Sequence, residues 1–375
     1  MDLAELGYRD GSWSGPFPPL DSPDTLVLAF AAPSFGARGD VLSALAAAYP
    51  RSVVVGCSTA GEIHQARILD ESIAVTVIRF AGTRVRCAQA TIAAAEDSFG
   101  AGSALAEELA GEGLRAVLVL SEGITVNGSA LVRGLNARLP AHVAVSGGLA
   151  GDGPRFGHTW VLAGGRAASH TAVAVGLYGD ALRITHGSQG GWDPFGPARE
   201  VTSSRDNVVF TLDGRPALSL YRKYLGDRAA ELPSSALLFP LGVGDSLDAP
   251  HRVVRTVLGV DEAAQSMTFA GDVPAGHFVK FMRASSDRLV LGARGAGQAA
   301  RDHHAGPVLA LAVSCVGRRV VLGERTEEEL DAVQEILPPG AIQVGFYSYG
   351  ELSPHDGRCE LHNQTMTLTL ISEVP

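Results

Sequence analysis

Apolar and polar positions follow one local pattern that occurs three times along the chain. Each copy begins at a proline, continues through a mostly apolar run that ends in valine, and closes on a polar turn in which an acidic residue follows a glycine. Because proline ends a helix, a valine-rich run favours a strand and glycine permits a tight turn, each copy predicts a short buried strand that leads into a polar bend. The three copies are residues 50–62 (PRSVVVGCSTAGE), 140–152 (PAHVAVSGGLAGD) and 339–351 (PGAIQVGFYSYGE).

The flanking residues extend each copy to a β-α-β-turn-β unit. The first strands are expected at 25–31, 115–120 and 308–314. The helices are expected at 40–49, 128–139 and 327–337. The closing strands are expected at 72–80, 171–178 and 365–371. Thr326 and Glu329 have the spacing of a capping box, and the alternation of TMTLTLI in the last strand predicts one solvent-facing side.

The repeated units predict an α/β protein of mixed-sheet α+β units in two domains. Residues 187–204 are dense in turn-forming residues and mark the expected boundary. The predicted division is an irregular N-terminal arm over 1–24, a first domain over 25–204 and a second domain over 205–375. Inside the second domain, further strands are expected at 207–213, 236–243, 252–260 and 278–283, and helices at 216–225 and near 287–303.

Composition and charge narrow the function classes. The chain has 375 residues, 46% of them hydrophobic, and a formal net charge of −10, which argues against a nucleic-acid surface. Its apolar runs are shorter than the ~18–20 residues that span a bilayer, and the N-terminus does not resemble a signal peptide. The four cysteines are scattered, so neither a disulfide framework nor a structural zinc site is expected. These features predict a cytoplasmic protein without membrane insertion.

The polar bends are the candidate ligand site. Their acids, Glu62, Asp152 and Glu351, could accept hydrogen bonds from a ligand amine, and the N–H groups of the glycine-rich turns could bind a carboxylate. The alternative is that these acids stabilise the turns themselves. The predicted ligand-binding residues are Ser58, Thr59, Gly61, Glu62, Gly147, Gly148, Gly151, Asp152, Tyr347, Ser348, Glu351, His362 and Asn363.

The ordered motifs resemble a known family. VVVGCSTAGEI and SGGLAGDG resemble the N-terminal FIST domain of bacterial sensory proteins, and GFYSYGELSP with LHNQTMTLTLI resembles the C-terminal FIST domain. The resemblance implies an intracellular signal-input module that binds small ligands such as amino acids. No kinase or cyclase segment accompanies these motifs, so the expected output is through a separate partner such as a histidine kinase.

Two further functions stay open at this stage. Some members of the family resemble nitric-oxide sensors that bind haem. No C-x-x-C-H motif is present, so any haem b would be held non-covalently, with His277 and His362 as candidate axial ligands. An enzyme acting on a small metabolite at the inter-domain cleft is the other alternative. Cys57 precedes Ser58, but GCSTAG does not have the G-x-S-x-G register, so no catalytic residue is assigned and a buried thiol is expected.

Overall fold

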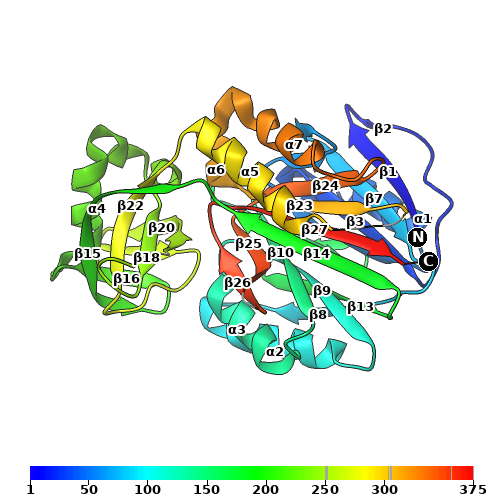
Figure 1. Ribbon diagram of the computed structural model, residues 1–375, viewed down its shortest axis with the longest axis horizontal. Helices are drawn as coiled ribbons and strands as arrows, with labels where there is room; N and C mark the ends of the chain where they lie inside the picture. Colours follow the sequence, from blue (N-terminus) through cyan, green and yellow to red (C-terminus); the bar gives the residue numbers. More distant parts are fainter. Residues whose placement is uncertain (250–251, 303, 305, 356, 375) are drawn as a thin grey trace.

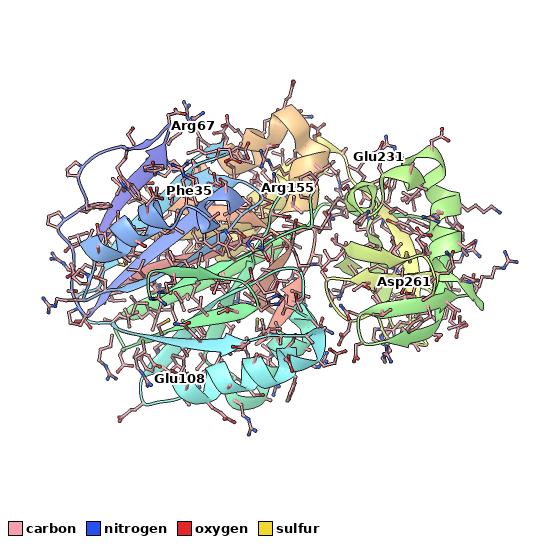
Figure 2. All side chains as sticks on the ribbon, turned by 180° about the vertical axis from the view of Figure 1, so that it is seen from behind. Phe35, Arg67, Glu108, Arg155, Glu231 and Asp261 are labelled. Carbon is pink, nitrogen blue, oxygen red and sulfur yellow. The ribbon has the colours of Figure 1, made fainter. Side chains whose placement is uncertain are left out.

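The computed structural model describes residues 1–249, 252–302, 304, 306–355 and 357–374. Three sheets form one body, and residues 193–283 form a separate lobe beside it (Figure 1). Figure 2 shows the same division from behind, with Phe35 and Glu108 on the body and Glu231 and Asp261 on the lobe. The mixed α/β class predicted from the sequence is confirmed. Among the described residues no helix could cross a membrane, and α5, with 15 residues, is the longest.

The body contains the three repeated units. The first comprises β3 (Thr25–Ala31), α1 (Gly39–Ala48), β4 (Val53–Ser58), β5 (Glu62–His64), β6 (Arg67–Leu69) and β7 (Ile73–Arg79). The second comprises β9 (Leu114–Ser121), α3 (Gly128–Arg138), β10 (Ala144–Leu149), β11 (Val161–Ala163), β12 (Arg166–Ala168) and β13 (Thr171–Tyr178). The third comprises β23 (Leu309–Cys315), α6 (Val316–Leu322), α7 (Thr326–Gln334), β24 (Ile342–Ser348), β25 (Gly350–His355), β26 (Arg358–His362) and β27 (Met366–Glu373).

Each unit places a hairpin in the sheet of another unit. After its bend, the chain leaves its own sheet and pairs antiparallel with the parallel strand of a neighbouring unit. The pairs are β5 with β24, β11 with β4 and β25 with β10. The exchange is cyclic, so each of the three sheets is completed by a segment from a different part of the sequence.

Apolar side chains of the three sheets meet in one central core. Phe30 of the first unit stacks on Phe346 of the third, with ring centroids 4.8 Å apart, and Leu118 of the second belongs to the same cluster. Helices cover the outer faces of the sheets, among them α5 (Ser286–Ala300) over β27 (Figure 1). The prediction that one side of the last strand faces solvent is wrong, because Thr367 and Thr369 are only 3% and 4% exposed. They lie in register with Val313 and Leu311 of the central core, and α5 covers the opposite side, which carries Leu368.

The N-terminal segment is more regular than predicted. The expected irregular arm contains β1 (Asp2–Arg9) and β2 (Ser12–Trp13). β1 pairs antiparallel with β7, and Leu6 and Tyr8 are buried beneath it. Burial of these two alternate side chains explains the strand, because period-two alternation matches a sheet with one covered face.

The lobe is inserted between a strand and a helix of the body. In the second unit, β8 (Arg84–Thr91) and α2 (Ser98–Leu109) precede the repeat and are joined by a short connection. In the third unit, β14 (Leu182–Gln189) and α5 have the same place, and the lobe lies between them. The turn-rich segment 187–204 therefore leads into the lobe, and the predicted boundary at residue 204 falls inside a strand of it.

The lobe has its own sheet and core. Its elements are β15 (Asp193–Arg205), β16 (Val208–Leu212), β17 (Arg215–Pro216), α4 (Ala217–Leu225), β18 (Leu241–Gly244), β19 (Val253–Arg255), β20 (Val257–Asp261), β21 (Ser266–Phe269) and β22 (Phe278–Arg283). The strand predicted at 236–243 is a 3-10 helix (Ser234–Leu238) followed by β18. The helix predicted near 287–303 is α5; residue 303 lies outside the described residues.

Candidate functional site

The three polar bends meet at one place in the body. Main-chain hydrogen bonds join them in a ring: Ala60 N–H to Tyr347 O (2.8 Å), Tyr349 N–H to Leu149 O (3.1 Å) and Gly151 N–H to Ser58 O (3.0 Å). Each bend thus donates to a different neighbour. The repeated turns therefore satisfy one another's main-chain groups, as burial requires.

Two of the three bend acids have the same surroundings. Glu62 accepts hydrogen bonds from Ser72 N–H (3.2 Å) and Ser72 Oγ (2.7 Å), as well as from the Thr59 hydroxyl. Glu351 accepts them from Thr365 N–H (3.1 Å), Thr365 Oγ1 (2.9 Å) and Ser348 Oγ (2.6 Å). Both carboxyls tie the bend to the beginning of the closing strand. Burial raises the pKa of each to about 7, and these hydrogen bonds oppose the rise.

Asp152 uses main-chain donors instead. Its carboxylate accepts hydrogen bonds from the N–H groups of Phe156 (2.9 Å), Gly157 (2.8 Å) and His158 (2.9 Å), and from the Tyr349 hydroxyl. Tyr349 belongs to the third unit, so this bond links two bends. The acid of the second unit therefore also fixes a turn.

The predicted bend residues are almost entirely enclosed. Glu62, Asp152 and Glu351 are 1%, 2% and 0% exposed. Ser58, Thr59, Tyr347, Ser348, Asn363 and the four bend glycines Gly61, Gly147, Gly148 and Gly151 are buried as well. None of them lines either of two clefts, of about 680 and 600 Å³, that the described residues form. Ligand binding by these residues stays a prediction.

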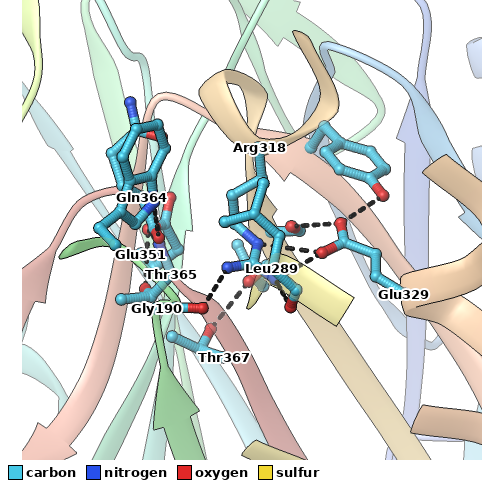
Figure 3. Close-up of polar contacts among 12 residues, drawn as sticks. Gly190, Leu289, Arg318, Glu329, Glu351, Gln364, Thr365 and Thr367 are labelled. Atoms are coloured by element: carbon cyan, nitrogen blue, oxygen red, sulfur yellow. Dashed lines mark hydrogen bonds and ion pairs between the residues drawn. The ribbon is translucent and has the colours of Figure 1, made fainter. Parts of the chain in front are cut away.

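A buried ion pair beside the bends was not predicted (Figure 3). Arg318 and Glu329 have fully buried side chains and pair at 2.6 Å. Glu329 also accepts hydrogen bonds from Ser314 Oγ (2.9 Å) and Tyr347 Oη (2.7 Å), and Arg318 donates to Gly190 O (2.7 Å). The predicted capping box is therefore wrong, because Glu329 points into the protein and the residue before α7 is Arg325. In the sequence, the indication of this pair is the occurrence of Arg318 and Arg319 directly after an apolar strand.

A cleft of about 680 Å³ lies between the lobe and the body. The body contributes α3 and β26, and the lobe contributes β18, β19 and the segment before β22. Apolar walls come from Val132, Val243 and Leu361. Six charged side chains of both signs share the lining: Arg133, Arg255, Arg358, Asp245, Asp272 and Glu360.

Asp272 attaches the lobe to the beginning of α3. Its carboxylate accepts hydrogen bonds from Asn127 Nδ2 (2.9 Å) and from Arg133, and its N–H donates to Ser129 Oγ (3.0 Å). Asn127 also caps α3 through a bond from Ala130 N–H (3.0 Å). The lobe contact and the helix cap thus share one side chain.

The two predicted haem ligands occupy different places. His277 lines the cleft. His362 lies next in sequence to the lining residue Leu361, and its Nε2 has no hydrogen-bond partner among the described residues. Burial, and then the charge of Arg255, lowers the pKa of His362 to about 4, so its ring is neutral. A haem needs an axial ligand and room for a large flat apolar ring, and a lining with six charged side chains fits that group poorly.

The thiol considered for an enzyme is enclosed. Cys57 is 0% exposed, as expected for a buried cysteine. Burial raises its pKa well above the ordinary value, which disfavours the nucleophilic thiolate. The geometry around Cys57 gives no support to covalent chemistry there.

Two family models together match most of the chain. The model described as the FIST N domain matches residues 25–215, and that described as the FIST C domain matches residues 217–354. The chain is also similar to uncharacterized proteins of Mycobacterium bovis and Mycobacterium tuberculosis, with 26% identity over 263 residues. That match covers 68% of this chain and 66% of each relative, just under two thirds of their length.

One solved structure aligns along most of the chain at low similarity. A cyanuric acid hydrolase from A. caulinodans covers 93% of this chain, and the alignment covers 90% of the hydrolase, with 10% identity and a TM-score of 0.35. A TM-score this low does not indicate a shared activity.

Proposed function

Because the chain belongs to the FIST family of sensory domains, we propose that it binds a small molecule in the cleft between the lobe and the body. The observation that carries the proposal is the cleft of about 680 Å³, lined from both parts of the molecule. Small-molecule sites commonly have ~300–1,000 Å³ and lie where two structural units meet. The enclosed carboxylates of the bends bond to the turns themselves, so this proposal places the ligand in the cleft and not at the bends.

The signal is a change in the lobe contact. A ligand that touches both α3 and the lobe favours one placement of the lobe over others, by its difference in affinity for them. A separate partner such as a histidine kinase then binds one placement more tightly. The shared role of Asn127, which caps α3 and binds Asp272, supports this coupling because any lobe movement alters the helix cap.

The ligand of this proposal is an amino acid or a related metabolite. The cleft has three arginines and three acids, and this balance suits a molecule with one group of each charge. The haem-sensor alternative has less support, since the charged lining fits a haem poorly.

Mass analysis of the molecule that co-purifies with native protein, followed by a thermal-shift screen of metabolites, tests the proposal. A ligand at 100 times its Kd adds about 2.7 kcal/mol to the free energy of unfolding, which is measurable as a rise in Tm. Val253 lines the cleft and is 40% exposed, so Val253→Trp should fill the cleft and abolish the rise. Val320→Trp, at a position that is 41% exposed on α6, is the matched control and should keep it.

Three results would count against the proposal. One is a native protein that contains no small molecule and is stabilised by none. Another is a rise in Tm that persists unchanged in Val253→Trp. The third is a Soret band in protein produced with haem, because that would favour the haem sensor.

A further inference from the structure

Arg255 is a buried cation whose hydrogen bonds go only to main-chain oxygens. Its residue is 9% exposed, and its guanidinium donates to Leu361 O (3.0 Å), Asp272 O (3.2 Å) and Val254 O (3.3 Å). Within the described residues, no carboxylate pairs with it, and its Nη2 makes no hydrogen bond. A buried charge ordinarily has a charged partner, so this guanidinium has unused capacity.

The other charges of the cleft leave Arg255 available. Arg133 pairs with Asp272. Arg358 and Asp245 are exposed, and Glu360 is half-buried. The neutral ring of His362 is close enough for the charge of Arg255 to help lower its pKa. Arg255 is therefore a buried positive charge on the cleft wall without a direct ion pair among the described residues, and the charges of Asp272 and Glu360 act on it from a greater distance. The acids that could meet a ligand cation are Asp245 and Glu360.

We propose that Arg255 binds the carboxylate of a small ligand in this cleft, and that Asp245 and Glu360 hold the amine of the same molecule. A guanidinium presents parallel N–H groups that match a carboxylate or a phosphate. The carboxylate is favoured here because three acids already line the cleft and would repel a dianion. The assignment rests on the proposed function and adds the residues that bind each charged group of the ligand.

Calorimetry with the full chain tests the assignment. The probes are the common amino acids, the amide of each, which lacks the carboxylate, and inorganic phosphate. We expect at least one amino acid to bind the wild-type protein, with its amide at least about tenfold weaker, since a hydrogen bond to a charged group is among the stronger kinds. Phosphate should bind more weakly than the amino acid.

Variants then locate the contact. Arg255→Gln should lower the affinity for the amino acid about 10- to 100-fold, and Arg255→Lys less, because lysine keeps the charge but not the fork. Arg252→Gln is the matched control: Arg252 also donates to main-chain oxygens of the lobe, namely those of Phe278, Ser246 and Leu247, and does not line the cleft. The affinity of the Arg252→Gln variant for the amino acid should equal that of the wild type. Asp245→Asn should weaken the binding of the amino acid and leave unchanged the binding of the corresponding acid that lacks the amine.

Each contrary outcome has a stated meaning. Equal binding of amino acid and amide, preference for phosphate, binding unaffected by Arg255→Gln, or no binding of any probe would overturn the assignment. If Arg255→Gln does not fold, the comparison of acid with amide on the wild-type protein decides. None of these results removes the proposed function, which stands or falls on the co-purified molecule and on the Val253→Trp variant.

Discussion

At the scale of single residues, burial decides what each charged side chain does. Glu329 looks from sequence like a capping residue at the surface, yet it is 0% exposed and bonded to Arg318. Glu335, six positions further on, pairs with Arg294 at 2.9 Å, but these side chains are 61% and 43% exposed. The two ion pairs have similar geometry and should differ widely in their effect on stability.

We expect Glu329→Gln to lower the free energy of unfolding by about 3–5 kcal/mol, because it leaves Arg318 buried without its counter-charge. Glu335→Gln should change it by less than about 1 kcal/mol, since the exposed pair is screened by water. Chemical denaturation of both variants measures the difference. Equal losses would show that Arg318 finds another partner.

The bend carboxyls predict a pH dependence. Burial raises the pKa of Glu62 and Glu351 from 4.5 to about 7, so between these values the folded state binds more protons than the unfolded state. The free energy of unfolding should therefore fall as pH rises from about 4.5 to about 7, by on the order of 1–3 kcal/mol for each carboxyl.

Glutamine mimics the protonated acid. The double variant Glu62→Gln, Glu351→Gln should flatten this pH dependence, whereas Glu112→Gln at an exposed position should leave it as in the wild type. Denaturation curves between pH 4.5 and 8 would decide, and an unchanged slope in the double variant would contradict the assignment to these two carboxyls.

At the scale of elements, neighbours decide which face of a strand is wet. The alternating pattern of β27 is that of a half-exposed strand, but α5 covers the side that carries Leu368 and Leu370. The side that carries Thr369 faces the central core, where Thr369 lies opposite Leu311. The sequence signal for that face is weak because threonine is tolerated both in a covered sheet and in water. The strand was readable from the sequence, whereas the burial of both its faces was not.

A charged residue at position 369 distinguishes a buried strand face from a solvent-exposed one. Thr369→Asp should lower the free energy of unfolding by at least about 3 kcal/mol, because a buried carboxylate would lack a partner. Thr91→Asp, at an exposed position of β8, should be nearly neutral. Thermal or chemical denaturation checks both, and tolerance of Thr369→Asp would mean that the central core does not enclose this side of the strand.

At the scale of the whole molecule, the exchanged hairpins make the body one cooperative unit. β5 pairs with β24, β25 pairs with β10, and β14 pairs with β27, so strands from the two halves of the sequence complete each other's sheets. The lobe is different, because its strands pair among themselves and its ends lie side by side, with Asp193 paired to Arg283.

Division of the chain into two halves and deletion of the lobe should therefore have opposite effects on folding. Residues 1–204 and 205–375, produced separately, should not fold cooperatively, because each lacks partner strands of the other. Replacement of residues 193–283 by a short Gly/Ser linker should leave a folded though less stable body. Circular dichroism with thermal unfolding and size-exclusion chromatography distinguish these outcomes. Independent folding of the two halves would contradict the interlaced arrangement.

The sequence by itself determined the repeated unit. The strand Thr25–Ala31, the helix after it and the polar bend were readable because prolines, glycines and apolar periodicity act over a few neighbouring residues. The same local signals placed β13 and β22 at the predicted residues. They also marked the three bends as equivalent before any contact between them was known.

Only the tertiary structure decided how the units and the lobe fit together. Ser58 accepts its bond from Trp160 N–H, 102 positions away, and Arg255 donates to Leu361 O, 106 positions away. Contacts of such separation depend on which elements lie side by side, and local patterns carry no record of that. For this reason the sequence left open whether the bend acids bind a ligand or stabilise the turns, and neither their enclosure nor the position of the cleft between lobe and body could be read from it.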